Sequence, residues 1–405
     1  MLAYSAIYFM AVISIVFGSY RSLRFVEKHV KENKKIENSI RLKDAKWFPI
    51  SASVVLFAFY VAFRYALVVE KTVDTLLLVN RYLDGNRWLN ATAVRDFLMA
   101  LKAERTNNGF KLKEYLMIVL PVFFCFQGVL MLSALIKPLV SRLLNKLPQS
   151  LVERVKLVYF SLKFSRSNTD EFTRKKDLVD WSFDSHDLYS AALCSVVAIA
   201  HITKSHWITN DIFAFAFSLY SIGALHLSSF KGGIMLLAGL FVYDIFWVFA
   251  TDVMATVATN INAPILLMFP QDLLEKGLGG TKFAMLGLGD VVIPGIFLAL
   301  LLRYGVSVKN RLYFYIPLIA YGAGLILTIA VMHYFKAGQP ALLYLVPSCI
   351  GAPLLLAFIN GDSTTLMNFS EDHLVLEEDE EEAEIAEVKD TDKTAESKEE
   401  TKKEK

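Results

Sequence analysis

The chain has 405 residues, of which 55% are apolar and only 20% charged, and its formal net charge is +2. This composition excludes a disordered chain, and three cysteines in that length exclude a disulfide scaffold. The nearly neutral balance gives no reason to expect nucleic acid as a partner.

The apolar residues fall in long blocks, which are typical of membrane spans. A bilayer core of about 30 Å needs about 20 helical residues. We expect an all-α, polytopic fold with nine transmembrane helices, at residues 2–20, 48–69, 115–136, 188–203, 207–226, 232–254, 283–304, 312–334 and 339–359. The first block has no basic segment before it and is followed by Arg21 and Arg24, which favours a retained span over a cleaved signal peptide.

Basic residues predict the orientation of these spans. Residues 21–46 contain nine Lys/Arg and residues 137–176 contain ten, so we assign both segments to the cytosol. The N-terminus is then lumenal and the C-terminus cytosolic. Residues 71–113 are lumenal in this arrangement although they hold eight Lys/Arg, and long polar segments do translocate despite their charge. Asn90 begins an Asn-Ala-Thr sequon in this loop, which predicts glycosylation.

The same pattern divides the chain into three regions. Residues 1–186 form an N-terminal membrane region with three spans, a lumenal loop at 71–113 and a cytosolic loop at 137–186. Residues 187–361 form a six-span region, and 362–405 a disordered acidic cytosolic tail, since sixteen Asp/Glu and six Lys follow from residue 371 onward. Lys402 and Lys403 have the form of a dilysine retrieval signal for the endoplasmic reticulum, or are a chance product of a Lys/Glu-rich tail.

Two aspartates lie inside expected spans. An Asp at the centre of a membrane helix costs roughly 2.5 to 3.5 kcal/mol, and no Lys or Arg accompanies Asp244 in its span. Counted as helical rise, the depths of Asp244 and Asp290 differ by roughly 5 Å, so the two carboxylates can face each other. Such a pair shares one proton and holds an acid and a base at once. It can activate water and protonate a departing amine in peptide hydrolysis.

The neighbours of the two aspartates allow more than one interpretation. Gly287 and Gly289 permit an extended substrate to lie against the backbone beside Asp290, or they serve close helix packing. Tyr243 orients the adjacent carboxyl, or contributes packing only. Pro340 in the first turn of the last span is an ordinary helix start, whereas Pro347 inside the span should kink it.

Three motifs in this order carry a resemblance. Tyr243-Asp244, Gly287-Leu288-Gly289-Asp290 and Pro340-Ala341-Leu342 together resemble the intramembrane aspartyl proteases of the presenilin and signal peptide peptidase clan. The wider strings at residues 269–278 and 283–295 look like the signal peptide peptidase branch. The short connection at 255–282 and the lumenal N-terminus also favour that branch over presenilin.

The resemblance implies a presenilin-like fold in which residues 187–361 are catalytic. Asp244 and Asp290 would be the catalytic pair, with water as the nucleophile and no cofactor or metal. A further set would shape the site and bind substrate: Tyr243, Gly287, Leu288, Gly289, Gln339, Pro340, Ala341 and Leu342. The branch cleaves type II-oriented transmembrane segments, including remnant signal peptides, in the endoplasmic reticulum membrane. Self-association and quality-control partners stay open.

Two other classes of function are compatible with the residues alone. In a proton- or cation-coupled transporter the same carboxylates would form a relay, and such proteins have repeated halves. We find no convincing internal repeat in this sequence. A nonproteolytic quality-control factor would bind membrane segments and use its acidic tail to recruit partners.

Overall fold

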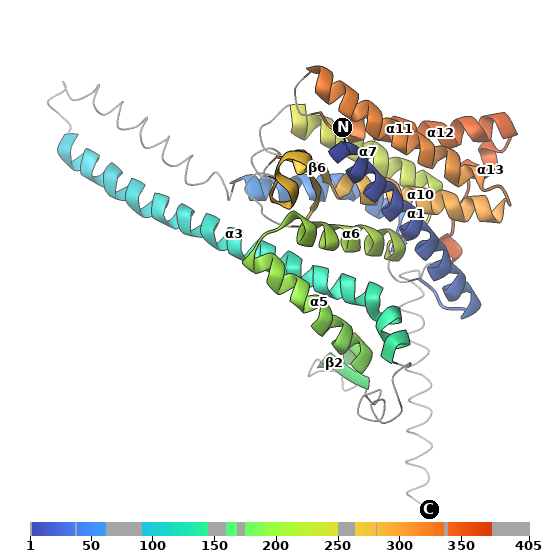
Figure 1. Ribbon diagram of the computed structural model, residues 1–405, viewed down its shortest axis with the longest axis horizontal. Coiled ribbons are helices and arrows are strands. Elements are labelled where there is room, and N and C mark those ends of the chain that lie inside the picture. The colour runs from blue at the N-terminus through green and yellow to red at the C-terminus, as the bar shows by residue number, and fades with distance from the viewer. Residues whose placement is uncertain are drawn as a thin grey trace, which may run out of the picture.

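The computed structural model describes residues 2–36, 39–61, 91–144, 159–167, 175–249, 264–280, 282–335 and 339–374 (Figure 1). Asn90, Lys402 and Lys403 lie outside these residues, so the expected glycosylation and retrieval signals stay predictions. In α3 (Ala91–Leu144) the structure describes side chains from Tyr115 onward, and after residue 144 it describes them again from Asp184.

The described chain is mostly helical. Its long helices are α1 (Leu2–Lys31), α3 (Ala91–Leu144), α5 (Ser185–Thr203), α6 (Trp207–Ala224), α7 (Phe230–Phe249), α10 (Gly289–Ser307), α11 (Leu312–Phe335) and α12 (Leu342–Asn360). Another helix covers residues 42–61. Within the described part of the chain, seven helices are long and apolar enough to cross a membrane. This confirms a polytopic membrane protein. Helices α5 and α6 coincide with the fourth and fifth expected spans but are not among the seven, and the count of nine stays a prediction.

Three short sheets correct the expectation of an all-α fold. Strands β1 (Ser39–Ile40) and β4 (His226–Leu227) pair in parallel, and β2 (Tyr159–Ser167) pairs antiparallel with β3 (Lys175–Asp184). The third sheet joins β5 (Leu266–Pro270) and β6 (Phe283–Gly287) in an antiparallel hairpin. In β5 and β6 apolar side chains such as Met268, Phe269 and Phe283 suit a half-buried strand.

The hairpin β5–β6 overturns part of the expected seventh span. Residues 283–304 were expected to be one helix, but the chain is extended through Gly287 and α10 begins at Gly289. Glycine is a poor helix former, and β5 offers backbone partners up to Leu288, whose N–H donates to Ile265 O over 3.1 Å. The helix then starts as the N–H groups of Val291 and Val292 donate to Leu288 O.

Helix α10 lies at the centre of the bundle, among α1, α6, α7, α11 and α12 (Figure 1). Small residues permit this close packing, because a Cβ added at Gly18 of α1 or at Gly295 of α10 would lie only 2.7 or 2.5 Å from the side chain of Ile222 in α6. In the same view α3 extends away to one side and α5 packs along part of it. The expected site residues lie in the bundle, away from the part of α3 that extends from it.

The segment after the last span is folded, which corrects the expected start of the tail at residue 362. Helix α13 (Ser363–Met367) and the short 3-10 helix η2 (Asp372–Leu374) follow α12. Backbone bonds join this segment to the rest of the chain, and the side chain of Glu371 is buried. The boundary therefore moves past Leu374. Residues 375–405 are not among the described residues.

Candidate active site

Asp244 lies in the second half of α7 and is 4% exposed. Its Oδ2 accepts a hydrogen bond of 3.0 Å from the backbone N–H of Leu342, the first residue of α12. The first N–H groups of a helix have no partner within it, and they favour negative charge. The structure thus brings the Pro340-Ala341-Leu342 motif directly to Asp244.

Asp290 lies in the first turn of α10 and is half-buried. Its backbone carbonyl accepts a hydrogen bond of 3.1 Å from the hydroxyl of Tyr321, which is fully buried in α11. Asp244 thus lies at the N-terminus of α12, and Asp290 lies at the N-terminus of α10.

The two glycines beside Asp290 have different surroundings. A Cβ added at Gly287 would lie 3.4 Å from Oδ2 of Asp290, whereas one added at Gly289 would meet no described atom within 4 Å. Gly287 is therefore in van der Waals range of the carboxylate, and Gly289 borders open space. This geometry favours a path for an extended chain over helix packing as the reason for Gly289.

The hairpin that leads into Asp290 is held by two polar residues of α6. Asn210 Nδ2 donates to Leu266 O over 2.7 Å, and Met268 N donates to Asp211 Oδ1 over 2.8 Å. These bonds satisfy backbone groups of β5 that point away from β6. Asp211 is 8% exposed, and its Oδ2 has no hydrogen-bond partner among the described residues.

Other expected site residues have weaker contacts. The ring of Tyr243 packs against Trp247, with centroids 6.4 Å apart, which favours the packing interpretation for this residue. The hydroxyl of Tyr344 lies 3.5 Å from Gln339 Oε1, at the limit of a hydrogen bond. Within the described residues, no group of three or more His, Cys, Asp or Glu side chains could hold a metal ion.

Sequence reasoning missed Tyr321, Asn210 and Asp211. A signal was present for Asp211, because it is an ionisable residue within the expected fifth span and such residues are expensive there. Tyr321 gave no signal, since one tyrosine in an apolar helix is ordinary.

A family model described as signal peptide peptidase matches residues 31–373. The chain belongs to the signal peptide peptidase family. It is 40% identical to intramembrane protease 2 of Caenorhabditis elegans, over 90% of each chain. It is 39% identical to the signal peptide peptidase of Homo sapiens, over 91% of this chain and 84% of the human protein. The mouse signal peptide peptidase gives the same identity over 91% and 83%.

Membership of this family makes the chain a protease and a multi-pass membrane protein. The transporter hypothesis and the nonproteolytic hypothesis lose their support. The matched residues contain Asp244, Asp290 and the start of α12, and they extend beyond the last span.

Proposed function

We propose that the chain is an intramembrane aspartyl endopeptidase whose catalytic residues are Asp244 and Asp290. The observation that carries the proposal is the placement of two aspartates at two helix N-termini, with Asp244 bonded to Leu342 N and Asp290 in the first turn of α10. Two carboxylates inside apolar spans are costly. Acid and base chemistry is a reason to retain them.

In the proposed reaction the pair holds one proton. The ionised carboxylate takes a proton from water as the water oxygen bonds to the scissile carbonyl carbon, and the protonated carboxyl donates to the carbonyl oxygen. As the C–N bond breaks, the first carboxyl protonates the nitrogen, and the second carboxylate takes a proton from one of the two hydroxyls of the intermediate as the C=O bond re-forms, which returns the dyad to its starting state. Water is the only co-reactant, and we propose no metal or cofactor.

The substrate we propose is a type II-oriented transmembrane segment, including a remnant signal peptide. The open space at Gly289 supports an extended chain beside Asp290. Next to Asp244, the face of α7 carries exposed apolar side chains, among them Val242, Phe246 and Phe249. Such a face suits a substrate that arrives within the bilayer. The human and mouse relatives are named signal peptide peptidase, which also supports signal peptides as substrates.

The remaining parts of the proposal concern the whole molecule. We propose nine spans, a presenilin-like fold, an N-terminal membrane region at 1–186 and a catalytic region at 187–361. The proposed location is the endoplasmic reticulum membrane, with a lumenal N-terminus, a glycan on Asn90 and retrieval through Lys402 and Lys403. Homo-oligomerisation and quality-control partners belong to the same proposal.

The test is cleavage of a labelled signal peptide by protein reconstituted in liposomes. Asp244→Asn and Asp290→Asn should each abolish cleavage while the purified protein keeps its thermal midpoint. Asp44→Asn is the matched control, because Asp44 is exposed and lies outside the bundle of aspartate helices. Turnover that persists in either of the first two variants contradicts the proposal.

A further inference from the structure

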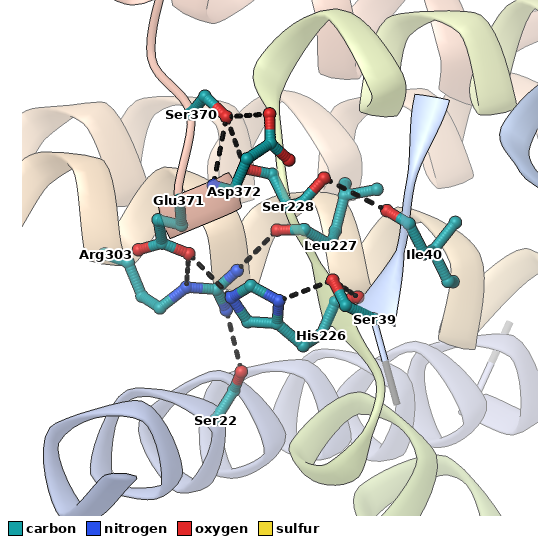
Figure 2. Close-up of polar contacts among 10 residues, drawn as sticks. All are labelled: Ser22, Ser39, Ile40, His226, Leu227, Ser228, Arg303, Ser370, Glu371 and Asp372. Carbon is teal, nitrogen blue, oxygen red and sulfur yellow. Dashed lines mark hydrogen bonds and ion pairs between the residues drawn. The ribbon is translucent and has the colours of Figure 1, made fainter. Parts of the chain in front are cut away.

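A buried ionic cluster lies at the far end of α10 from Asp290 (Figure 2). It consists of Arg303, His226 and Glu371, which are 4%, 1% and 8% exposed. Oε2 of Glu371 accepts a hydrogen bond of 2.9 Å from Arg303 Nε and lies 2.8 Å from His226 Nε2. Arg303 follows Asp290 by thirteen residues of the same helix, a distance of about 20 Å.

Arg303 connects several elements at this end of the bundle. Its two terminal nitrogens donate to Ser22 Oγ of α1 over 2.8 Å and to Leu227 O of β4 over 3.0 Å. His226 in turn lies 2.8 Å from Ser39 Oγ of β1. Each of the three guanidinium nitrogens therefore has a hydrogen-bond partner. Through them Arg303 joins α10 to α1, to β4 and to the segment that follows α12 (Figure 2). A charge buried this deeply is tolerated only with such partners.

The segment that carries Glu371 is also fixed through its backbone. The N–H of Glu371 donates to Ser228 O over 2.7 Å. The N–H of Phe230, the first residue of α7, donates to Phe369 O over 3.1 Å. Ile36 N donates to Leu374 O over 2.8 Å. The same short segment thus holds the start of the Asp244 helix and the end of the Asp290 helix.

Helix α12 therefore contacts the Asp244 helix at its start, and the segment that follows it contacts both aspartate helices at the opposite end. Its first residue donates to Asp244, and the segment after it binds Arg303 of α10. We propose that Glu371 is a positioning residue of the protease, which sets the alignment of Asp290 with Asp244 by fixing α10 against α7. This inference rests on the proposed function of the aspartate pair.

Two arguments favour positioning over a purely structural role. A helix transmits a rotation or shift at Arg303 to its first turn, and a displacement of 1 Å at reacting groups costs about 100-fold in rate. The match to the family model also continues past the last span to residue 373 and so includes Glu371. The part of the chain that matches the family model thus contains the segment that binds α10.

The kinetic test compares Glu371→Gln with Glu32→Gln, a control at an exposed surface pair with Lys28 and Lys34. We expect Glu371→Gln to lower kcat by about 10-fold or more with little change in KM, because misplaced aspartates affect the transition state more than substrate binding. Glu32→Gln should leave both unchanged. A wild-type kcat in Glu371→Gln overturns the inference.

A double variant separates positioning from stability. Arg303→Met combined with Glu371→Gln removes the unpaired buried charge, so its thermal midpoint should recover relative to Glu371→Gln alone. If Glu371 positions the helix through Arg303, kcat should stay low in the double variant. A kcat that recovers together with the midpoint shows a structural role only and overturns the inference.

A distance measurement tests the alignment without any turnover. Spin labels at Phe246→Cys on α7 and Met285→Cys on β6 occupy exposed positions, and the native cysteines are buried. We expect Glu371→Gln, but not Glu32→Gln, to shift or broaden the distance distribution between the labels. If Glu371→Gln leaves the distance distribution unchanged, the inference is wrong, whether or not this variant still cleaves peptides. Inactivity of the wild-type protein contradicts the proposed function alone.

Discussion

The backbone N–H of Leu342 donates to Oδ2 of Asp244 over 3.0 Å, although the two residues are 98 positions apart. The bond places the carboxylate at the N-terminus of the last helix, where partial positive charge stabilises an anion. It also fixes which oxygen of Asp244 faces the helix, so the other oxygen is free to act on a reactant. The position of this carboxylate therefore depends on the start of α12 as well as on α7.

This dependence makes the length of the side chain critical. Asp244→Glu keeps the charge but adds one methylene, which moves the carboxylate relative to Leu342 N and to Asp290. We expect kcat to fall by about 100-fold or more, the cost of a displacement near 1 Å. Steady-state cleavage of the labelled signal peptide in liposomes measures this. Wild-type turnover by Asp244→Glu would argue against a geometrically fixed pair.

Gly289 and Gly287 provide a matched pair of sites for testing the substrate path. A side chain at Gly289 meets no described neighbour, so Gly289→Val should fold yet fill the space beside Asp290. We expect a raised KM and a displaced cleavage site, read by mass spectrometry of the products. Gly287→Ala adds only an ordinary contact of 3.4 Å to Asp290 and should have a smaller effect on KM. Equal kinetics for Gly289→Val and wild type would contradict this path.

Asp211 supports the active site through the hairpin β5–β6. Asp211→Ala removes the acceptor for Met268 N, a hydrogen bond to a charged group of the kind worth about 1.5 to 3 kcal/mol. We expect lower kcat and faster hydrogen exchange at β5, since the strand loses an anchor. Asp211→Asn keeps an acceptor oxygen and should retain most activity. Identical exchange at β5 in Asp211→Ala and wild type would rule out this anchoring role.

The ionic cluster predicts how stability changes with pH. Burial, opposed by Glu371, lowers the pKa of His226 from its ordinary value of 6.5. Below pH 6.5 His226 therefore takes up a proton in the unfolded chain more readily than in the folded chain. The contribution of His226 to the free energy of unfolding is thus fully present above this pH and falls on acidification. Burial alone would raise the pKa of Glu371, but Arg303 and His226 hold it below 4.5, so its own contribution is lost only at lower pH.

Thermal unfolding in detergent between pH 7.5 and 5.5 isolates the histidine. The wild-type midpoint should fall across this range, with a slope of up to about 1.4 kcal/mol per pH unit from one proton. His226→Gln cannot titrate and should show a flatter dependence. Parallel pH profiles for the two proteins would show that His226 does not control this effect. Asp372 also acts on His226, so Asp372→Asn is a useful second comparison.

The aspartate pair could be proposed from sequence because charge inside an apolar span is rare and costly, whereas Pro340-Ala341-Leu342 was identified only through the family resemblance. Strand β6 could not be predicted from the sequence, because residues 283–287 are apolar and continuous with a span by hydropathy. Its structure depends on pairing with β5, which hydropathy does not detect. Glu371 was counted as part of the acidic tail for a similar reason. Its partners Arg303 and His226 lie 68 and 145 positions away.

Helix α3 has 54 residues, about 81 Å of helical rise, whereas a bilayer core is about 30 Å thick. The portion apolar enough to cross a membrane is Met117–Leu144. The preceding residues 91–116 therefore form a rod of about 39 Å that continues the span beyond the bilayer. In the proposed topology this rod stands in the lumen, where its outer end is well clear of the lipid headgroups and within reach of soluble lumenal proteins.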